Sequence, residues 1–258
     1  MITVAVTIQK GGDGKTTTAH ALGAGLSRFA GARVLFVDMD SSGNLGRILE
    51  ADKSGAVPDT LSILTGEATA AEAVQHTAGG DIIASTPALA GAEREKALTG
   101  VGREYRLRKA LEPLSGSYDY CIIDTPPALG ILTVNALTAA DKVVIPAQAD
   151  DLSLDALEKL SETIEAVRSY CNPALEVDGI LLTRYNGRTN VTRYLEELIT
   201  EAAQSLGARV YETRIRECSY LKEAKTMRED IYSYSPRSNA ARDYKSFVDE
   251  FIGGKDNG

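Results

Sequence analysis

The chain has 258 residues, of which 43% are hydrophobic and 25% are charged, with a formal net charge of −8. This is the composition of an ordinary globular protein, and its three cysteines and two histidines show no spacing typical of a metal site. The negative charge argues against coverage by nucleic acid, although residues 184–245 hold 12 Lys and Arg against 9 Asp and Glu, so one face can still be basic.

Apolar segments and helical patterns alternate along the chain. We expect strands at 2–8, 33–40, 81–85, 119–124, 142–148, 177–183 and 208–213, and helices at 16–30, 104–114, 153–170, 190–206 and 239–252. Several strands are apolar throughout, as in a sheet covered on both faces. The sequence therefore predicts one α/β domain over 1–252, with a mostly parallel twisted sheet flanked by helices on both faces. Residues 253–258 are expected to form a frayed tail.

Targeting signals and membrane spans are not expected. No segment approaches the ~18 consecutive apolar residues of a spanning helix, and the apolar start lacks the basic lead of a signal peptide. We expect a soluble cytoplasmic protein without an N-terminal helix-turn-helix domain.

The segment QKGGDGKTTT at 9–18 lies between the first strand and the first helix, where a phosphate loop must lie. Its glycines and the helix N-terminus would form an anion cradle. Lys15 would reach the β- and γ-phosphates, and Thr16 would bind Mg²⁺. The alternative is a glycine-rich turn without a ligand. The loop residues expected to bind nucleotide are Lys10, Gly11, Gly12, Asp13, Gly14, Lys15, Thr16 and Thr17.

Carboxylates follow two of the expected strands. Asp124 ends the apolar strand of DYCIID and can hold Mg²⁺ opposite Thr16. Taken alone, it would more often be a strand-ending Asp that caps the next helix, and the phosphate loop is what favours the magnesium role. Asp38 and Asp40 end the second strand, at the sheet edge where open α/β sheets bind ligands. One of the two could orient or deprotonate a water, unless DMDSSGN is only a turn.

Five motifs together resemble the ParA/Soj partition ATPases, within the deviant Walker A group that includes MinD. They are QKGGDGKTTTAHALG, VLFVDMDSSGNLG, YDYCIIDTPPALGILTVNALTAAD, ILLTRYNGRT and YSPRSNAARDY, and the resemblance covers about residues 2–250. It implies that ATP and Mg²⁺ are bound, and that Lys10 reaches the phosphates of a partner subunit in a homodimer. The resemblance also implies that Lys10, Lys15 and Asp40 are catalytic. Asp40 would contact Mg²⁺ through water, and Thr16 and Asp124 would serve the metal.

Two positions depart from the family pattern. Asp13 stands where a small or apolar residue is usual, and a carboxylate facing triphosphate would cost Coulomb energy. We expect Asp13 either to point to solvent or to weaken nucleotide binding or dimerisation. Ser41 and Ser42 replace Pro and Gln, which affects the geometry around Asp40 and the rate of hydrolysis rather than the class of protein.

The adenine site and a DNA-binding surface are also inferred from the resemblance. Arg184, Tyr185 and Pro236 would hold the base. A basic surface on the dimer would bind nonspecific DNA through phosphate contacts. The candidates for that surface are Arg188, Arg193, Arg214, Arg216 and Lys222, with Lys225 and Arg228 also basic in this region.

The resulting hypothesis is a nucleoid-associated ATPase for plasmid or chromosome partition, with slow hydrolysis stimulated by a ParB-like partner. A MinD-like membrane ATPase would need a basic amphipathic C-terminal helix, but KSFVDEFIGGKDNG is rich in acids. An iron–sulfur reductase would need paired ligating cysteines, and an amide synthetase would need a substrate pocket that the sequence does not reveal.

Overall fold

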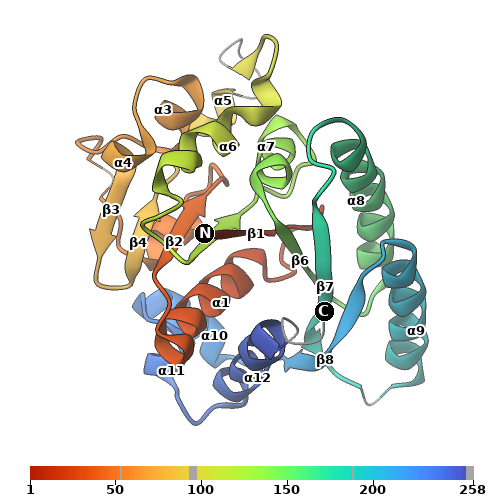
Figure 1. Cartoon of the computed structure of the whole chain (residues 1–258). Helices are drawn as coiled ribbons and strands as arrows, with labels where there is room; N and C mark the ends of the chain where they lie inside the picture. The colour runs from red at the N-terminus through yellow and green to blue at the C-terminus, as the bar shows by residue number, and fades with distance from the viewer. Residues whose placement is uncertain (53, 93–97, 188, 254–258) are drawn as a thin grey trace.

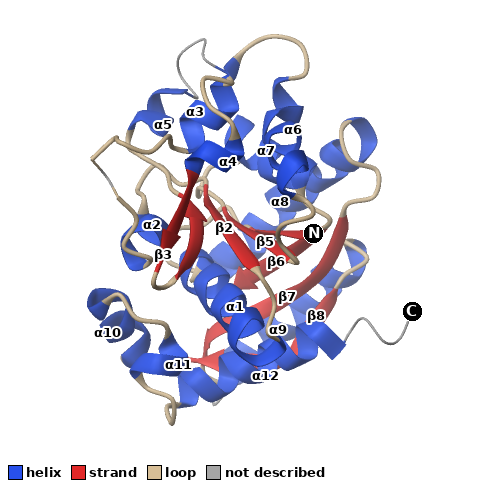
Figure 2. Cartoon of the chain, turned by 60° about the vertical axis from the view of Figure 1, so that its left-hand side comes forward, coloured by secondary structure: helices blue, strands red, loops and turns tan. Residues whose placement is uncertain are grey.

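The computed structural model describes residues 1–52, 54–92, 98–187 and 189–253. One eight-stranded sheet runs through the molecule in the order β3-β4-β2-β5-β1-β6-β7-β8, and Figure 2 shows its strands as a layer between helices. The strands are β1 (Ile2–Val6), β2 (Val34–Asp38), β3 (Val74–Thr77), β4 (Gly80–Ile83), β5 (Tyr120–Asp124), β6 (Lys142–Ala147), β7 (Glu176–Tyr185) and β8 (Arg209–Arg216). Neighbouring strands are parallel except for β3 and β4.

Helices cover both faces of this sheet. They are α1 (Lys15–Ala30), α2 (Asn44–Ile48), α3 (Thr60–Thr65), α4 (Ala70–Ala73), α5 (Ala88–Ala92), α6 (Arg106–Leu111), α7 (Ile131–Ala139), α8 (Asp151–Tyr170), α9 (Asn190–Ser205), α10 (Tyr220–Met227), α11 (Ile231–Tyr234) and α12 (Asn239–Gly253), with short 3-10 turns η2 (Arg103–Tyr105) and η3 (Glu112–Leu114). Figure 1 shows α1 and α12 on one side of the sheet and α6, α7 and α8 on the other.

Successive side chains of the central strands point to opposite faces of the sheet, so they pack alternately against the helices on one face and on the other. In β1, Val4 and Val6 belong to the core that α1 and α12 complete, whereas Ala5 belongs to the core beneath α7 and α8. Both sets are fully buried, which explains why the strand reads as a continuous apolar run. The predicted mostly parallel sheet with helices on both faces is confirmed.

The register of the central strands places the candidate site. Asp124 at the end of β5 is paired with Val6 on one side and with Asp38 on the other. The loop after β1 and the loop after β2 therefore leave the sheet beside the same carboxylate. This is the edge at which parallel α/β sheets bind ligands.

Several elements differ from the sequence-based expectations, among them the helices α3, α7 and α10, which were not predicted. The antiparallel edge strand β3 was not predicted, and β8 continues to Arg216, beyond the expected end at 213. Helix α12 includes Gly253, the first residue of the expected tail, and 254–258 lie outside the described residues.

Candidate nucleotide site

The loop between β1 and α1 has the backbone geometry of an anion cradle. Gly12 and Gly14 adopt φ values of 91° and 86°, a left-handed region that side chains disfavour. Gly14 also precedes the first turn of α1, and no side chain caps that end of the helix. The first amide groups of α1 and the positive end of its dipole are thus directed at a bound anion.

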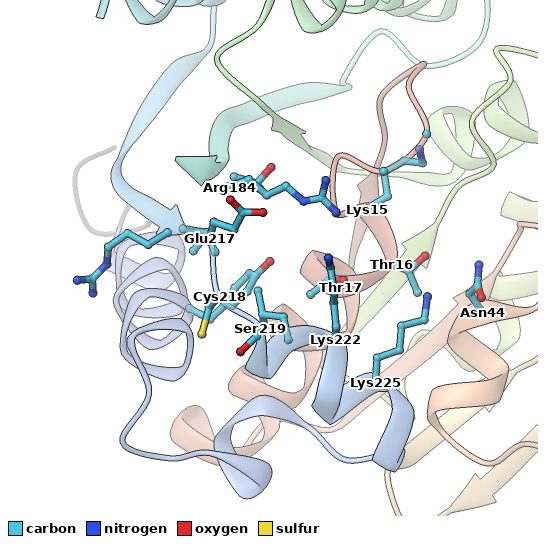
Figure 3. A pocket seen from close by; sticks show the side chains of 18 of the residues that line it. Lys15, Thr16, Thr17, Asn44, Arg184, Glu217, Cys218, Ser219, Lys222 and Lys225 are labelled. Carbon is cyan, nitrogen blue, oxygen red and sulfur yellow. The ribbon is translucent and has the colours of Figure 1, made fainter. Parts of the chain in front are cut away.

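A cavity of about 750 Å³ opens on this loop, and its size is within the range usual for small-molecule sites. Figure 3 shows its walls: Lys15, Thr16 and Thr17 from α1, Arg184 from β7, and Lys222 and Lys225 from α10. Gly11, Gly12, Gly14 and Asp40 also line it. The predicted loop residues are therefore brought together, with the exception of Lys10 and Asp13, whose side chains lie behind the loop.

Asp124 lies beneath the cavity as a buried carboxylate. Its side chain is inaccessible, and neither oxygen accepts a hydrogen bond of ordinary geometry among the described residues, although the Thr16 hydroxyl lies close enough to lower its pKa as a donor. Burial raises the pKa of Asp124 well above its ordinary range, and the neighbouring Asp38 raises it further, while Thr16 and Lys15 act in the opposite direction. An unpartnered carboxylate beside a threonine hydroxyl fits the ligand chemistry of Mg²⁺.

The two aspartates after β2 have different environments. Asp38 is fully buried and accepts hydrogen bonds from the backbone amides of Asp40 and Gly46, at 3.1 and 3.0 Å. Burial raises the pKa of Asp38 to about 6 despite these bonds. Asp40 instead lines the cavity, and its carboxylate accepts a hydrogen bond of 2.9 Å from the Ser42 amide. Of the pair, Asp40 is the carboxylate positioned to face a water in the cavity.

The two lysines of the loop are held in different directions. The Lys15 ammonium donates to the Lys10 carbonyl oxygen at 2.7 Å, and burial lowers the pKa of Lys15. The Lys10 ammonium points away from its own cradle, into a group of acceptors from Asp13, Asp150 and Ser153. Lys10 is therefore not directed at a nucleotide in its own subunit.

Of the two expectations for Asp13, the first is wrong, whereas the second, weaker nucleotide binding or dimerisation, stays a prediction. Its side chain is fully inaccessible, so it does not point to solvent. Its carboxylate accepts hydrogen bonds from Gln148 at 2.7 Å and Ser153 at 3.2 Å, on the side of the loop that faces α8. The Asp13 carbonyl oxygen is fixed separately, by the Thr183 hydroxyl at 3.0 Å.

Of the three residues inferred to hold the base, one lines the cavity. Arg184 lines it with a positive φ of 47°, an uncommon conformation for a non-glycine residue. Residues 215–218, at the end of β8, form the facing wall. Tyr185 and Pro236 are not among the described residues that line the cavity, and the Tyr185 hydroxyl donates to Glu196 at 2.6 Å. Sequence reasoning missed this wall because no motif marks residues 215–218.

The candidate DNA-binding residues do not form one free basic surface. Arg214 is ion-paired with Glu196, and Arg216 lies 2.5 Å from Asp243. Lys222 projects over the cavity (Figure 3). Arg193 is exposed on α9, and Arg188 lies outside the described residues. Because Arg214 and Arg216 are each paired with a carboxylate, they are less available to contact DNA phosphates.

The cysteines do not gather around a common centre. Cys121 is buried in β5, where burial raises its pKa to about 12, so the thiolate that a metal cluster requires is disfavoured. Cys218 lines the nucleotide cavity. Among the described residues, no group of three or more His, Cys, Asp or Glu side chains could hold a metal ion.

Sequence comparison with known proteins gives a family for this chain. A family model described as "AAA domain" matches residues 1–177. The sporulation initiation inhibitor protein Soj of Bacillus subtilis is 41% identical over 249 residues, which is 96% of each chain. The chromosome partitioning protein ParA of Caulobacter vibrioides is 37% identical over 253 residues, 96% of this chain and 93% of that protein.

Solved structures also match over nearly the whole chain. Apo McdA of Cyanothece has a TM-score of 0.87 at 28% identity, covering 98% of this chain and 99% of that one. A cobyrinic acid a,c-diamide synthase from Mycobacterium smegmatis, with bound ATP analog and magnesium, has a TM-score of 0.81 at 32% identity, covering 100% and 96%.

The phosphate loop, the buried carboxylate and the parallel sheet together define a P-loop nucleotide-binding protein. Within that class, the chain belongs to the ParA family of partition ATPases, as the near full-length identity to Soj and ParA shows.

Proposed function

We propose that this chain binds ATP with Mg²⁺ in the cavity and hydrolyses it slowly. The observation that supports this most strongly is the unpartnered, buried Asp124 beneath an uncapped phosphate loop. Thr16 and Asp124 would hold Mg²⁺, with Asp40 contacting it through water, and the metal would neutralise charge on the phosphates. Lys15 would exchange its bond to the Lys10 carbonyl for the β- and γ-phosphates, while Asp40 would orient the attacking water.

The proposed active form is a sandwich homodimer, in which Lys10 of each subunit reaches the triphosphate held by the other. An ammonium supplied in trans would stabilise charge on the transferred phosphoryl group, as an arginine finger does. ATP would then control pairing, because a lysine has no anion to reach in the empty site. ATP would serve as a switch ligand whose hydrolysis reverses dimerisation.

The dimer would act in DNA partition by binding nonspecific DNA through phosphate contacts, which would place it on the nucleoid in the cytoplasm. Among the candidate contacts that the structure describes, Arg193 on α9, Arg216 at the end of β8 and Lys222 on α10 are exposed, and Arg216 is the one of these three that is ion-paired. A ParB-like centromere-binding protein would stimulate hydrolysis and so release the dimer from DNA.

The membrane alternative is less well supported by the packing of the C-terminal helix. In α12, Phe247, Val248 and Phe251 are buried against the sheet and α1, so this apolar face is already occupied. No helix among the described residues has the length and apolar character to cross a membrane.

The test is a pelleting assay with nonspecific DNA and, in parallel, with anionic liposomes, each with ATP, ADP or no nucleotide. We expect the protein to bind DNA with ATP but not with ADP or without nucleotide, and we expect the Lys15→Ala variant not to bind DNA under any of these conditions. Binding to liposomes instead of DNA would favour the MinD-like alternative, and binding to DNA without regard to nucleotide would refute the proposed switch.

A further inference from the structure

The loop of this chain holds its own lysine with two carboxylates. The Lys10 ammonium lies 2.9 Å from Asp13 Oδ1 and 2.7 Å from Asp150 Oδ2, and it donates to the Ser153 hydroxyl at 3.1 Å. An ammonium has three protons to donate, so these three residues satisfy it completely. Lys10 is therefore bound within its own subunit by the group of acceptors that Asp13, Asp150 and Ser153 form.

The two carboxylates differ in what happens when Lys10 leaves. Asp150 is 40% exposed and precedes α8, where it accepts a hydrogen bond from the Ser153 amide at 2.8 Å. Water can replace the lysine there. The Asp13 side chain is 0% exposed and would keep only the neutral donors Gln148 and Ser153. A buried carboxylate that loses its cation is strongly disfavoured, whereas an exposed one is not.

The proposed function requires that move, because Lys10 must leave its own subunit to reach the partner's triphosphate. Each sandwich dimer moves two such lysines and so leaves two buried carboxylates unpaired. Asp13 also lies in the phosphate loop itself, where its uncompensated charge would be close to the anionic ligand. Both effects oppose closure of the dimer and arise from Asp13 rather than from Asp150.

We propose that Asp13 is an intrinsic brake on ATP-dependent dimerisation: it retains Lys10 in the monomer and raises the concentration of protein at which the ATP-bound dimer forms. This inference rests on the proposed function, since it assumes that Lys10 acts in trans. It explains how a carboxylate can occupy a phosphate loop without blocking the cavity, because the charge is neutralised by Lys10 behind the loop.

The experiment measures the dimer dissociation constant by sedimentation with a non-hydrolysable ATP analogue and Mg²⁺. Asp13→Asn keeps the size of the side chain and one acceptor oxygen while removing its charge, and its amide NH2 can donate to the Ser153 hydroxyl. We expect it to lower the dissociation constant about 10- to 100-fold, as expected when a buried unpaired charge is removed. Asp13→Val provides a second variant should the asparagine fail to fold, and is expected to change the constant in the same direction.

Asp150→Asn is the matched control, because asparagine caps a helix as well as aspartate does. We expect it to change the dissociation constant by less than about threefold, since its carboxylate is exposed. A wild-type dimer as tight as that of Asp13→Asn and Asp13→Val would overturn the brake while leaving the proposed function intact. If wild type and variants all bind the analogue in equilibrium dialysis yet stay monomeric, both the proposed function and the brake fail.

Discussion

Asp124 allows the metal site to be tested without any measurement of activity. The perturbation is Asp124→Asn, which removes the charge and keeps the size of the side chain. In the wild type this carboxylate is fully buried, makes no hydrogen bond of ordinary geometry with the described residues, and lies near two further carboxylates, Asp38 and Asp40. Without metal, the charged form is therefore unfavourable, and we expect the variant to be the more stable protein.

The size of the effect follows from the missing partners. Asparagine leaves a buried polar group as well, so the difference between the two proteins is the charge; a buried unsatisfied group costs more when it is charged than the about 1–3 kcal/mol of a neutral one, and we expect a gain of about 2 kcal/mol in the free energy of unfolding. For a chain of this size that gain corresponds to a rise of roughly 4–8 °C in melting temperature. With Mg²⁺ and nucleotide the order should reverse, because ligand at ~100 times its dissociation constant stabilises the wild type by about 2.7 kcal/mol.

The assay is thermal unfolding at neutral pH with an ATP analogue, in Mg²⁺ or in EDTA. Asp155→Asn, an exposed position on α8, serves as the control and should resemble the wild type in both conditions. The reasoning would be refuted if Asp124→Asn melted below the wild type in EDTA and still gained the full increment from Mg²⁺. That result would mean that Asp124 is stabilised by contacts other than a metal.

Three further predictions concern separate parts of the molecule. Burial lowers the pKa of His20 from 6.5 to about 4. Its contribution to the free energy of unfolding is therefore fully present above pH 6.5 and is lost as the pH falls toward 4. The loss amounts to about 3 kcal/mol, and denaturant unfolding of His20→Leu should show a flatter acid limb than the wild type. Arg193→Glu should reduce the ATP-dependent retention of the protein on DNA. The slope of the logarithm of the DNA-binding constant against the logarithm of the salt concentration should also fall by about one unit for each phosphate that the protein no longer neutralises. Lys159→Glu on α8 is the charge-matched control, and equal retention by both variants would exclude Arg193 from the DNA-binding surface. Lys222→Ala should weaken binding of a fluorescent ATP analogue up to about fivefold, because one exposed charge contributes at most about 1 kcal/mol; Lys245→Ala, on α12, should not, and an unchanged affinity in Lys222→Ala would remove that lysine from the site.

The features of the fold that sequence patterns could predict are those encoded locally. Long apolar runs such as 119–124 mark strands covered on both faces, and these runs placed seven of the eight strands. The missed strand β3 is short, lies at the sheet edge and follows the alanine-rich helix α4, so its period of two is obscured. Its pairing with β4 depends on a two-residue turn rather than on an apolar run.

The candidate site also contains some features that the local sequence predicts and others that depend on the fold. The cradle and the carboxylates Asp40 and Asp124 could be predicted, because each lies at or shortly after the end of a recognisable strand and parallel strands end at one edge of the sheet. The wall formed by residues 215–218 could not be predicted, since no motif marks them as part of a cavity and the sequence offered Arg216 only as a candidate DNA contact. The availability of Arg214 and Arg216 was equally hidden, because their partners Glu196 and Asp243 are 18 and 27 residues away in the chain.

Asp13 shows why a motif match does not establish what a substitution within the motif does. Its partners Gln148 and Ser153 lie 135 and 140 residues along the chain, at the junction of β6 and α8, and reach it only because β1 and β6 are neighbours in the sheet. Judged from the loop sequence alone, the carboxylate faces a phosphate site and should repel the ligand. In the fold, it faces the opposite side of the loop and binds the lysine whose release the proposed dimer requires. The charge therefore acts on the equilibrium between monomer and dimer more than on the affinity of the monomer for nucleotide, and separate measurements of these two quantities on Asp13→Asn distinguish the two interpretations.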